Sequence, residues 1–225
     1  VTDFDAISAR GGVTQPLEPG AYVINQEMVD RLKEAPLLEH PSNMTPMVAW
    51  EFTKKYGVPS YIYDPIFDHM TPLAKLTGIP EIQRTHMGHI ENMRAVSIKM
   101  AQELEKNVNE CNFIIAHLGG GITMCCDEKG RFVDFNDSSN SPFSPERAGI
   151  VPARQLSKLI YSGKYTEAEM TKMITGKGGM YAHLGTTDCR KVEQRILEGD
   201  EKARVVYEGM AYQTAKCIGA FAAVL

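Results

Sequence analysis

The sequence predicts an α/β fold, and three patterns along the chain support that prediction. Short apolar runs that end in polar residues, at 4–9 and 60–63, are typical of strands whose ends carry binding groups. Between Phe113 and Phe135, three β-prone runs separated by glycine-containing turns predict two successive hairpins. Other segments have apolar residues at every third or fourth position, as amphipathic helices do. Strands and helices that are interspersed in this way indicate an α/β protein.

Composition limits the partners that we expect for the chain. Its 225 residues, 43% of them hydrophobic, suffice for one large domain or two small ones. A formal net charge of −4 gives no basic surface for nucleic acid or for an anionic membrane. We therefore expect neither partner, although a small anion bound at one local site is compatible with this charge.

Cysteine content and hydropathy indicate a cytoplasmic protein. The five cysteines show no C-x-x-C spacing and are odd in number, so we expect reduced thiols rather than a disulfide framework. No apolar run is long enough to span a bilayer, and the first residues lack the pattern of a signal peptide. Val1 is not a methionine, and the last apolar-periodic segment stops at Leu225 without a terminating residue, so we expect a piece of a longer chain.

Three consecutive glycines mark the most informative stretch of the sequence. Gly119, Gly120 and Gly121 lie at the tip of the first predicted hairpin, after the apolar run 113–116. Glycine permits positive φ and lets another group approach backbone N–H donors, and a concave set of such donors binds anions. The alternative is that the glycines only shape a tight turn. His117, just before the tip, favours anion binding somewhat, while a buried structural histidine remains an alternative.

Two predicted strands place polar side chains at their carboxyl ends, where ligands gather in open α/β sheets. Arg10 ends the first strand and is a candidate clamp for carboxylate or phosphate oxygens. Its alternative is a surface arginine beside a glycine turn. Asp64 ends the strand over 60–63 and is our candidate ligand for Mg²⁺, directly or through water. Asn43, just before a helix predicted over 45–56, is a candidate helix cap.

Two further candidates lie later in the chain. His89 begins a helix predicted over 90–106, where it either caps the helix or contacts an anion, as a neutral donor or as a cation. We predict that this helix buries Met93, Val96, Met100 and Leu104. Arg147 is either a site residue or the partner of Glu146 in a surface ion pair.

The last third of the chain is predicted to be helical, over 151–163, 166–175, 188–197 and from Asp200 onward. Thr166 and Glu169 have the spacing of a capping box. The segment Gly176-Lys177-Gly178-Gly179 lacks the upstream spacing of a Walker A loop, so we interpret it as a turn.

Taken together, the motifs of this sequence resemble the butyrate kinase branch of the acetate and butyrate kinase family over nearly the whole chain. The motifs that carry the resemblance are Arg10-Gly11-Gly12, His40-Pro41-Ser42-Asn43, Tyr61-Ile62-Tyr63-Asp64-Pro65, His89 with Asn92, His117-Leu118-Gly119-Gly120-Gly121, Pro142-Phe143-Ser144-Pro145-Glu146-Arg147-Ala148-Gly149 and Gly176-Lys177-Gly178-Gly179.

The resemblance implies the actin-like ATPase fold, with two ribonuclease H-like domains that are both incomplete here. Residues 1–65 would be the C-terminal half of the first domain, and residues 66–225 the N-terminal part of the second. The implied reaction is reversible, Mg²⁺-dependent phosphoryl transfer between ATP and a short-chain carboxylate, butyrate or a branched acid, giving acyl phosphate and ADP. A homo-oligomer is also implied.

The resemblance further implies a role for each matching residue. It assigns the charge on the transferred phosphoryl group to Arg10, His89 and Arg147, and the magnesium to Asp64. The remaining substrate- or phosphate-binding positions are His40, Asn43, His117, Leu118, Gly119, Gly120 and Gly121. Two alternatives remain at this stage: another kinase of the same superfamily, such as a sugar kinase, or a non-catalytic fragment or interaction module.

Overall fold

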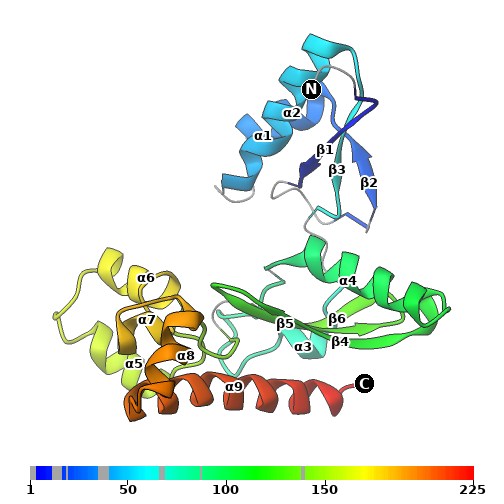
Figure 1. Cartoon of the computed structure of the whole chain (residues 1–225). Helices are drawn as coiled ribbons and strands as arrows, with labels where there is room; N and C mark the ends of the chain where they lie inside the picture. The colour runs from blue at the N-terminus through cyan, green and yellow to red at the C-terminus, as the bar shows by residue number, and fades with distance from the viewer. Residues whose placement is uncertain are drawn as a thin grey trace. The chain divides into compact units, whose positions relative to one another are not determined.

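The computed structural model describes residues 4–11, 17–18, 20–34, 41–65, 69–86, 88–137 and 140–225. The chain divides into two compact units, Val1–His69 and Met70–Leu225 (Figure 1). His40, a predicted phosphoryl-binding residue, lies outside the described residues. The predicted domain division at residue 65 and the ribonuclease H-like identity of each part stay predictions.

The first unit is a small sheet with helices on one side. Strand β3 is central, paired in parallel with β1 and antiparallel with β2. Helices α1 and α2 lie on the same side of this sheet (Figure 1). The elements are β1 (Ile7–Arg10), β2 (Ala21–Val23), α1 (Gln26–Glu34), the 3₁₀ turn η1 (Pro41–Asn43), α2 (Met44–Tyr56) and β3 (Ser60–Tyr63).

The core of the first unit lies between the sheet and these helices. It contains Ile24, Val29, Ala49 and Ile62, which are nearly inaccessible to solvent. The side chain of Phe52 stays exposed, because α2 buries the stripe that contains Ala49 and turns Phe52 outward. Burial of this apolar cluster fixes the carboxyl ends of β1 and β3, where Arg10 and Asp64 lie.

The second unit consists of an antiparallel sheet and a group of helices. The sheet order is β4-β5-β6, which confirms the two predicted hairpins. Its elements are α3 (Pro72–Lys75), α4 (Ile90–Glu103), the 3₁₀ turn η2 (Val108–Glu110), β4 (Asn112–Leu118), β5 (Ile122–Glu128), β6 (Arg131–Asn136), α5 (Ala153–Ile160), α6 (Glu167–Thr175), α7 (Gly179–Leu184), α8 (Cys189–Leu197) and α9 (Glu201–Ala222).

Strand β5 is buried along almost its whole length because helices cover both faces of the sheet. Helix α4 lies on one face and α9 on the other (Figure 1). Met124 and Cys126 form a cluster with Phe221 of α9. Since successive side chains of a strand point to opposite faces, Thr123 and Asp127 point toward α4. The face of β5 that carries polar groups is therefore the face covered by α4.

Helix α4 begins at the predicted residue but buries a different stripe from the predicted one. The prediction for Val96, Met100 and Leu104 is wrong, because these side chains are 46%, 38% and 50% exposed. The buried residues are Ile90, Met93, Ser97 and Ala101. The small side chains of Ser97 and Ala101 let the helix pack closely on the sheet. A search for periodic large apolar residues does not detect such positions.

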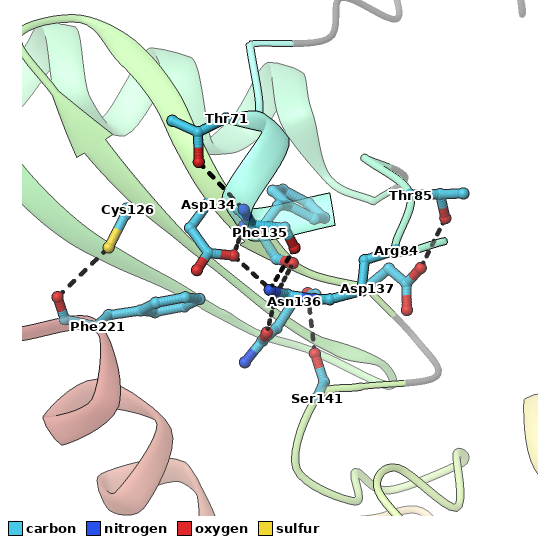
Figure 2. Close-up of polar contacts among 11 residues, drawn as sticks. Thr71, Arg84, Thr85, Cys126, Asp134, Phe135, Asn136, Asp137, Ser141 and Phe221 are labelled. Carbon is cyan, nitrogen blue, oxygen red and sulfur yellow. Dashed lines mark hydrogen bonds and ion pairs between the residues drawn. The ribbon is translucent and has the colours of Figure 1, made fainter. Parts of the chain in front are cut away.

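Arg84 and Thr85 anchor the segment that leads into α4 to strand β6 and to Asp137 just after it (Figure 2). Arg84 Nη2 donates to Asp134 Oδ1 at 2.7 Å and to Phe135 O at 2.7 Å, and Thr85 Oγ1 donates to Asp137 Oδ2 at 2.9 Å. The Arg84–Asp134 ion pair is only partly exposed. These contacts hold the approach to His89 against the sheet.

Several local signals of the helical part are confirmed. Thr166 and Glu169 form the predicted capping box, and Asp188 and Asp200 cap α8 and α9. The turn predicted at Gly176 is present, but helix α7, which begins at Gly179, was not predicted.

Two expectations from composition also have a structural counterpart. All five cysteines are free thiols, as predicted. In the described ranges of the chain, no helix is both long and apolar enough to cross a membrane.

Candidate functional site

Two histidines from different elements stack face to face in the second unit. The rings of His89 and His117 have centroids 3.7 Å apart and planes inclined by 5°. His89 occupies the N-cap position of α4 but makes no side-chain capping bond, so the capping alternative is wrong. Its Nδ1 lies instead 2.9 Å from Oγ1 of Thr123, the residue paired with His117 across the hairpin.

His117 is held by a residue one helical turn beyond His89. Asn92 Nδ2 lies 2.9 Å from Nδ1 of His117. Burial, and then the positive charge of Arg147, lower the pKa of His117 below the ordinary histidine value. His117 is therefore a neutral imidazole at neutral pH.

The three glycines at the tip let side chains approach the backbone closely. A Cβ on Gly119 would stand 2.8 Å from His117 Nε2, and one on Gly121 would stand 2.6 Å from Nη1 of Arg147. A Cβ on Gly120 would stand 3.1 Å from a carboxylate oxygen of Glu146. None of these three glycines has a positive φ. The tip therefore needs glycine because side chains lie close to its backbone, and not because the backbone is left-handed.

The loop that carries Arg147 is fixed to the glycine tip by Ser144. This serine is fully buried, and its Oγ donates to Gly120 O at 2.7 Å and accepts from Arg147 N at 3.0 Å. Glu146 N also donates to Gly120 O, at 3.1 Å. Glu146 and Arg147 face different glycines of the tip, Gly120 and Gly121. The loop therefore places the guanidinium beside His117 and the tip.

The Gly178-Gly179 pair supports this loop from behind. Gly178 N donates to Glu146 O at 3.0 Å, and Gly179 has a φ of 57°. A Cβ on Gly179 would come within 1.9 Å of Ser144 O and 2.5 Å of Arg147 O. The glycine-rich motif is thus a packing element for the Arg147 loop, in line with the rejection of a Walker A loop.

In the first unit, Arg10 and Asp64 lie at the carboxyl ends of the neighbouring parallel strands β1 and β3. Arg10 is exposed. Asp64 is only 2% exposed, has a φ of 42°, and accepts a hydrogen bond from Gly20 N at 2.8 Å through Oδ1. Asn43 is buried and occupies the N-cap position of α2 but makes no side-chain capping bond, so its capping alternative is wrong.

The first unit could hold a magnesium ion through a single carboxylate, with water and substrate phosphates as the other ligands. Within the described ranges, no three His, Cys, Asp or Glu side chains are grouped as a metal site. Mg²⁺ in phosphoryl-transfer sites keeps several waters and takes one or two carboxylates together with substrate phosphates. A single carboxylate fixed at a strand end, as Asp64 is, fits that mode of binding.

The predicted residues thus form two sets, one on each unit. The set on the second unit, which comprises His89, His117, the three glycines and Arg147, is brought together; Leu118 beside it is 67% exposed. Sequence reasoning assigned no role in the site to Asn92, Thr123 or Ser144. The three-residue spacing between His89 and Asn92 would have placed Asn92 on the same face of α4.

Comparison with known proteins gives consistent matches. The sequence profile of the acetokinase family matches residues 82–225. Probable butyrate kinase 2 of Caldanaerobacter subterraneus is 44% identical over 227 residues, covering 100% of this chain and 64% of that protein. A probable butyrate kinase of Phocaeicola vulgatus is 45% identical over 221 residues, covering 97% of this chain and 62% of that protein.

Among solved structures, Porphyromonas gingivalis acetate kinase matches with a TM-score of 0.81 at 22% identity, covering 97% of this chain and 58% of that one. This match confirms the predicted actin-like fold. The chain spans less than two thirds of the length of the curated relatives it matches.

Proposed function

The chain belongs to the acetokinase family, and from this premise we propose that it carries the phosphoryl-transfer site of an acyl kinase. The proposed reaction is reversible, Mg²⁺-dependent transfer between ATP and a short-chain carboxylate, giving acyl phosphate and ADP. Relatives named as probable butyrate kinases support butyrate or a similar acid as the acceptor. A cytoplasmic location and a homo-oligomeric state belong to the same proposal.

One observation carries the proposal: the second unit gathers groups suited to an anion around the glycine tip. The Arg147 guanidinium lies against Gly121, and Nε2 of His117 lies against Gly119. His89 is stacked on His117. Phosphoryl transfer needs mainly positioning and neutralisation of phosphoryl oxygens, and these groups are suited to that task.

The chemistry is an in-line displacement at the γ-phosphorus of ATP. A carboxylate oxygen of the acid forms a bond to phosphorus while the bond to the β,γ-bridging oxygen breaks, and the electron pair leaves with ADP. The carboxylate is already a nucleophile, so no general base is required. Arg147, Arg10 and His89 would stabilise charge on the transferred group, and His117 with the glycine tip would hold nucleotide phosphates.

Asp64 would hold Mg²⁺ directly or through water, as its place at the end of β3 allows. When bound, the ion neutralises phosphate charge and orients the phosphates. Asn43 belongs to the same unit and is proposed to contact substrate.

The decisive experiment replaces Arg147 in the full-length protein. Arg147→Ala removes the guanidinium beside the tip, and we expect kcat for acyl phosphate formation to fall by roughly 10²–10³-fold, the usual cost of one charge-stabilising group. Formation is measured with ATP, Mg²⁺ and butyrate by trapping acyl phosphate as a hydroxamate.

Arg190→Ala is the matched control, because Arg190 is an exposed arginine of α8 that pairs with Asp188. Turnover equal to that of the wild type in Arg147→Ala would remove Arg147 from the mechanism. Transfer of phosphate to a hydroxyl acceptor, but not to a carboxylate, would favour another kinase of the superfamily. The 225-residue chain alone is expected to show little or no turnover.

A further inference from the structure

Two hydrogen bonds connect α4 to the β4–β5 hairpin in a reciprocal manner. His89 of α4 contacts Thr123 of the hairpin, and His117 of the hairpin contacts Asn92 of α4, each at 2.9 Å. The two rings stack between these contacts. Each imidazole is thus held by a polar side chain of the element that carries the other imidazole.

The contact with Asn92 determines which nitrogen of His117 carries a proton. The structure orients the Asn92 amide with Nδ2 toward His117, and in this orientation Nδ1 of His117 is the acceptor, because Nδ2 only donates. A neutral imidazole that accepts at Nδ1 carries its proton on Nε2. That Nε2 is the ring atom that lies against Gly119.

Burial and Arg147 keep His117 uncharged, against the negative charge of the nearby Glu146. Arg147 faces it from the loop after β6, and the His89 ring covers it from α4. The carboxylate of Glu146 lies at the neighbouring Gly120. Burial and the guanidinium lower the pKa of His117, so the neutral form persists at neutral pH.

We propose that Asn92 is a positioning residue that fixes His117 as a neutral Nε2–H donor directed at the glycine tip. The assignment of a phosphate as the acceptor of that donor rests on the proposed function. In this arrangement an anion at the tip is bound through a hydrogen bond that does not require protonation of His117. Binding at the tip is therefore insensitive to the titration of this histidine at neutral pH and above.

Asn92→Asp tests the proposal because it reverses the polarity of the contact with little change in shape. An ionised carboxylate only accepts, so His117 must turn to the Nδ1–H form or become an imidazolium. The new negative charge should also raise the titration midpoint of His117, by on the order of one pH unit. Asn92 is exposed, so the substitution leaves the core intact.

The experiment is ¹⁵N NMR of the imidazole nitrogens in the 225-residue chain across the histidine titration range. We expect the Nε2–H form in the wild type, loss of that form in Asn92→Asp, and a mixture of tautomers in Asn92→Ala. The matched control is Asn112→Asp, which adds the same charge at an exposed position at the other end of β4. It should leave the His117 signals unchanged.

The outcome decides the role of Asn92 directly. An Nδ1–H or charged His117 in the wild type at neutral pH would overturn the proposal. So would an unchanged tautomer and midpoint in Asn92→Asp. Circular dichroism of each variant confirms that the compared proteins are folded.

Inorganic phosphate added to the same samples tests the donor. We expect it to shift the His117 Nε2 signal in the wild type, and to do so with an affinity several-fold lower in Asn92→Ala. A response of the Gly119–Gly121 amides without one at Nε2 would overturn the donor role of His117. Absence of any response would count against the proposed function, while the tautomer result still decides the role of Asn92.

Discussion

At Gly121 the missing side chain leaves room for the guanidinium of Arg147, whose Nη1 would lie 2.6 Å from a Cβ at that position. Gly119 likewise makes room for the ring of His117. Real Cβ atoms do not tolerate such distances, so either substitution would displace the functional side chain itself. At the scale of single residues, the site depends on small residues beside large polar ones.

Asp127 offers a test of how burial acts on a single charge. It is fully buried on β5, and in the described part of the chain neither of its carboxylate oxygens accepts a hydrogen bond of normal geometry. The nearby Ser97 Oγ donates instead to Arg94 O at 3.0 Å. Burial raises the pKa of Asp127, and the weaker influence of Ser97, Arg94 and the Gly130 backbone opposes this rise.

We predict that Asp127→Asn stabilises the fold at neutral pH by about 1 kcal/mol, because the neutral amide is buried at a lower cost in desolvation than the ionised carboxylate. Because the folded-state pKa is raised, the ionised form lowers stability once the pH exceeds the unfolded-state value of 3.8. The penalty is complete above the folded-state pKa and absent below 3.8. Urea unfolding of both proteins, from about pH 3 to neutral pH, measures how this penalty grows with pH.

The control is Asp188→Asn, which alters a half-buried carboxylate that caps α8 and whose pKa is lowered by its hydrogen bond with Arg190. No gain in stability is expected there. A loss of stability in Asp127→Asn at neutral pH would mean that the buried carboxylate contributes a favourable charge interaction with Arg94.

At the scale of elements, the fold follows the sequence closely where the signal is local. The capping box of Thr166 and Glu169 lies where predicted, because a cap is formed by residues within one helical turn. Helix α7 was missed because its two-glycine start looks like a turn. The glycines at the start of α7 are explained only by the Arg147 loop that packs against them.

Gly179 and Gly185, at the two ends of α7, form a matched pair for testing this packing. Both have positive φ, 57° and 73°, but only Gly179 has neighbours that an added Cβ would meet. Alanine at either position should lose about 1–2 kcal/mol of stability from its left-handed backbone. Gly179→Ala should lose more, by about 1–3 kcal/mol, because Ser144 O must move.

Chemical denaturation measures these losses, and the amide NMR signals of Ser144 and Arg147 report the loop. We expect those signals to shift in Gly179→Ala and to stay in place in Gly185→Ala. Equal losses in the two variants, with an unchanged loop, would refute the supporting role of Gly179.

At the scale of the whole molecule, each of the two units packs around buried residues of its own and carries its own set of candidate residues. The core around Ile62 belongs to the first unit, and that around Met124 belongs to the second. Arg10 and Asp64 are fixed by the first sheet, whereas His89, His117 and Arg147 are fixed by the second unit.

The net charge of −4 leads to a prediction for the molecule as a whole. We expect no binding to single-stranded DNA or to vesicles of phosphatidylserine, even at low salt, where a basic surface would bind most strongly. Fluorescence anisotropy and vesicle co-sedimentation measure this, with a basic peptide as the positive control. Salt-sensitive binding to either probe would show a local basic surface that the net charge conceals.

The sequence by itself determined the α/β class, the hairpins and the capping box of Thr166 and Glu169, and it named most of the candidate residues. These features depend on neighbours in the chain and on motifs read in order. Only the tertiary structure decided that α4 buries Ser97 and Ala101, that Asn92 holds His117, and that Gly179 supports the Arg147 loop. Such contacts join residues far apart in sequence, and they depend on which face of a strand meets which face of a helix. Local periodicity does not specify that pairing.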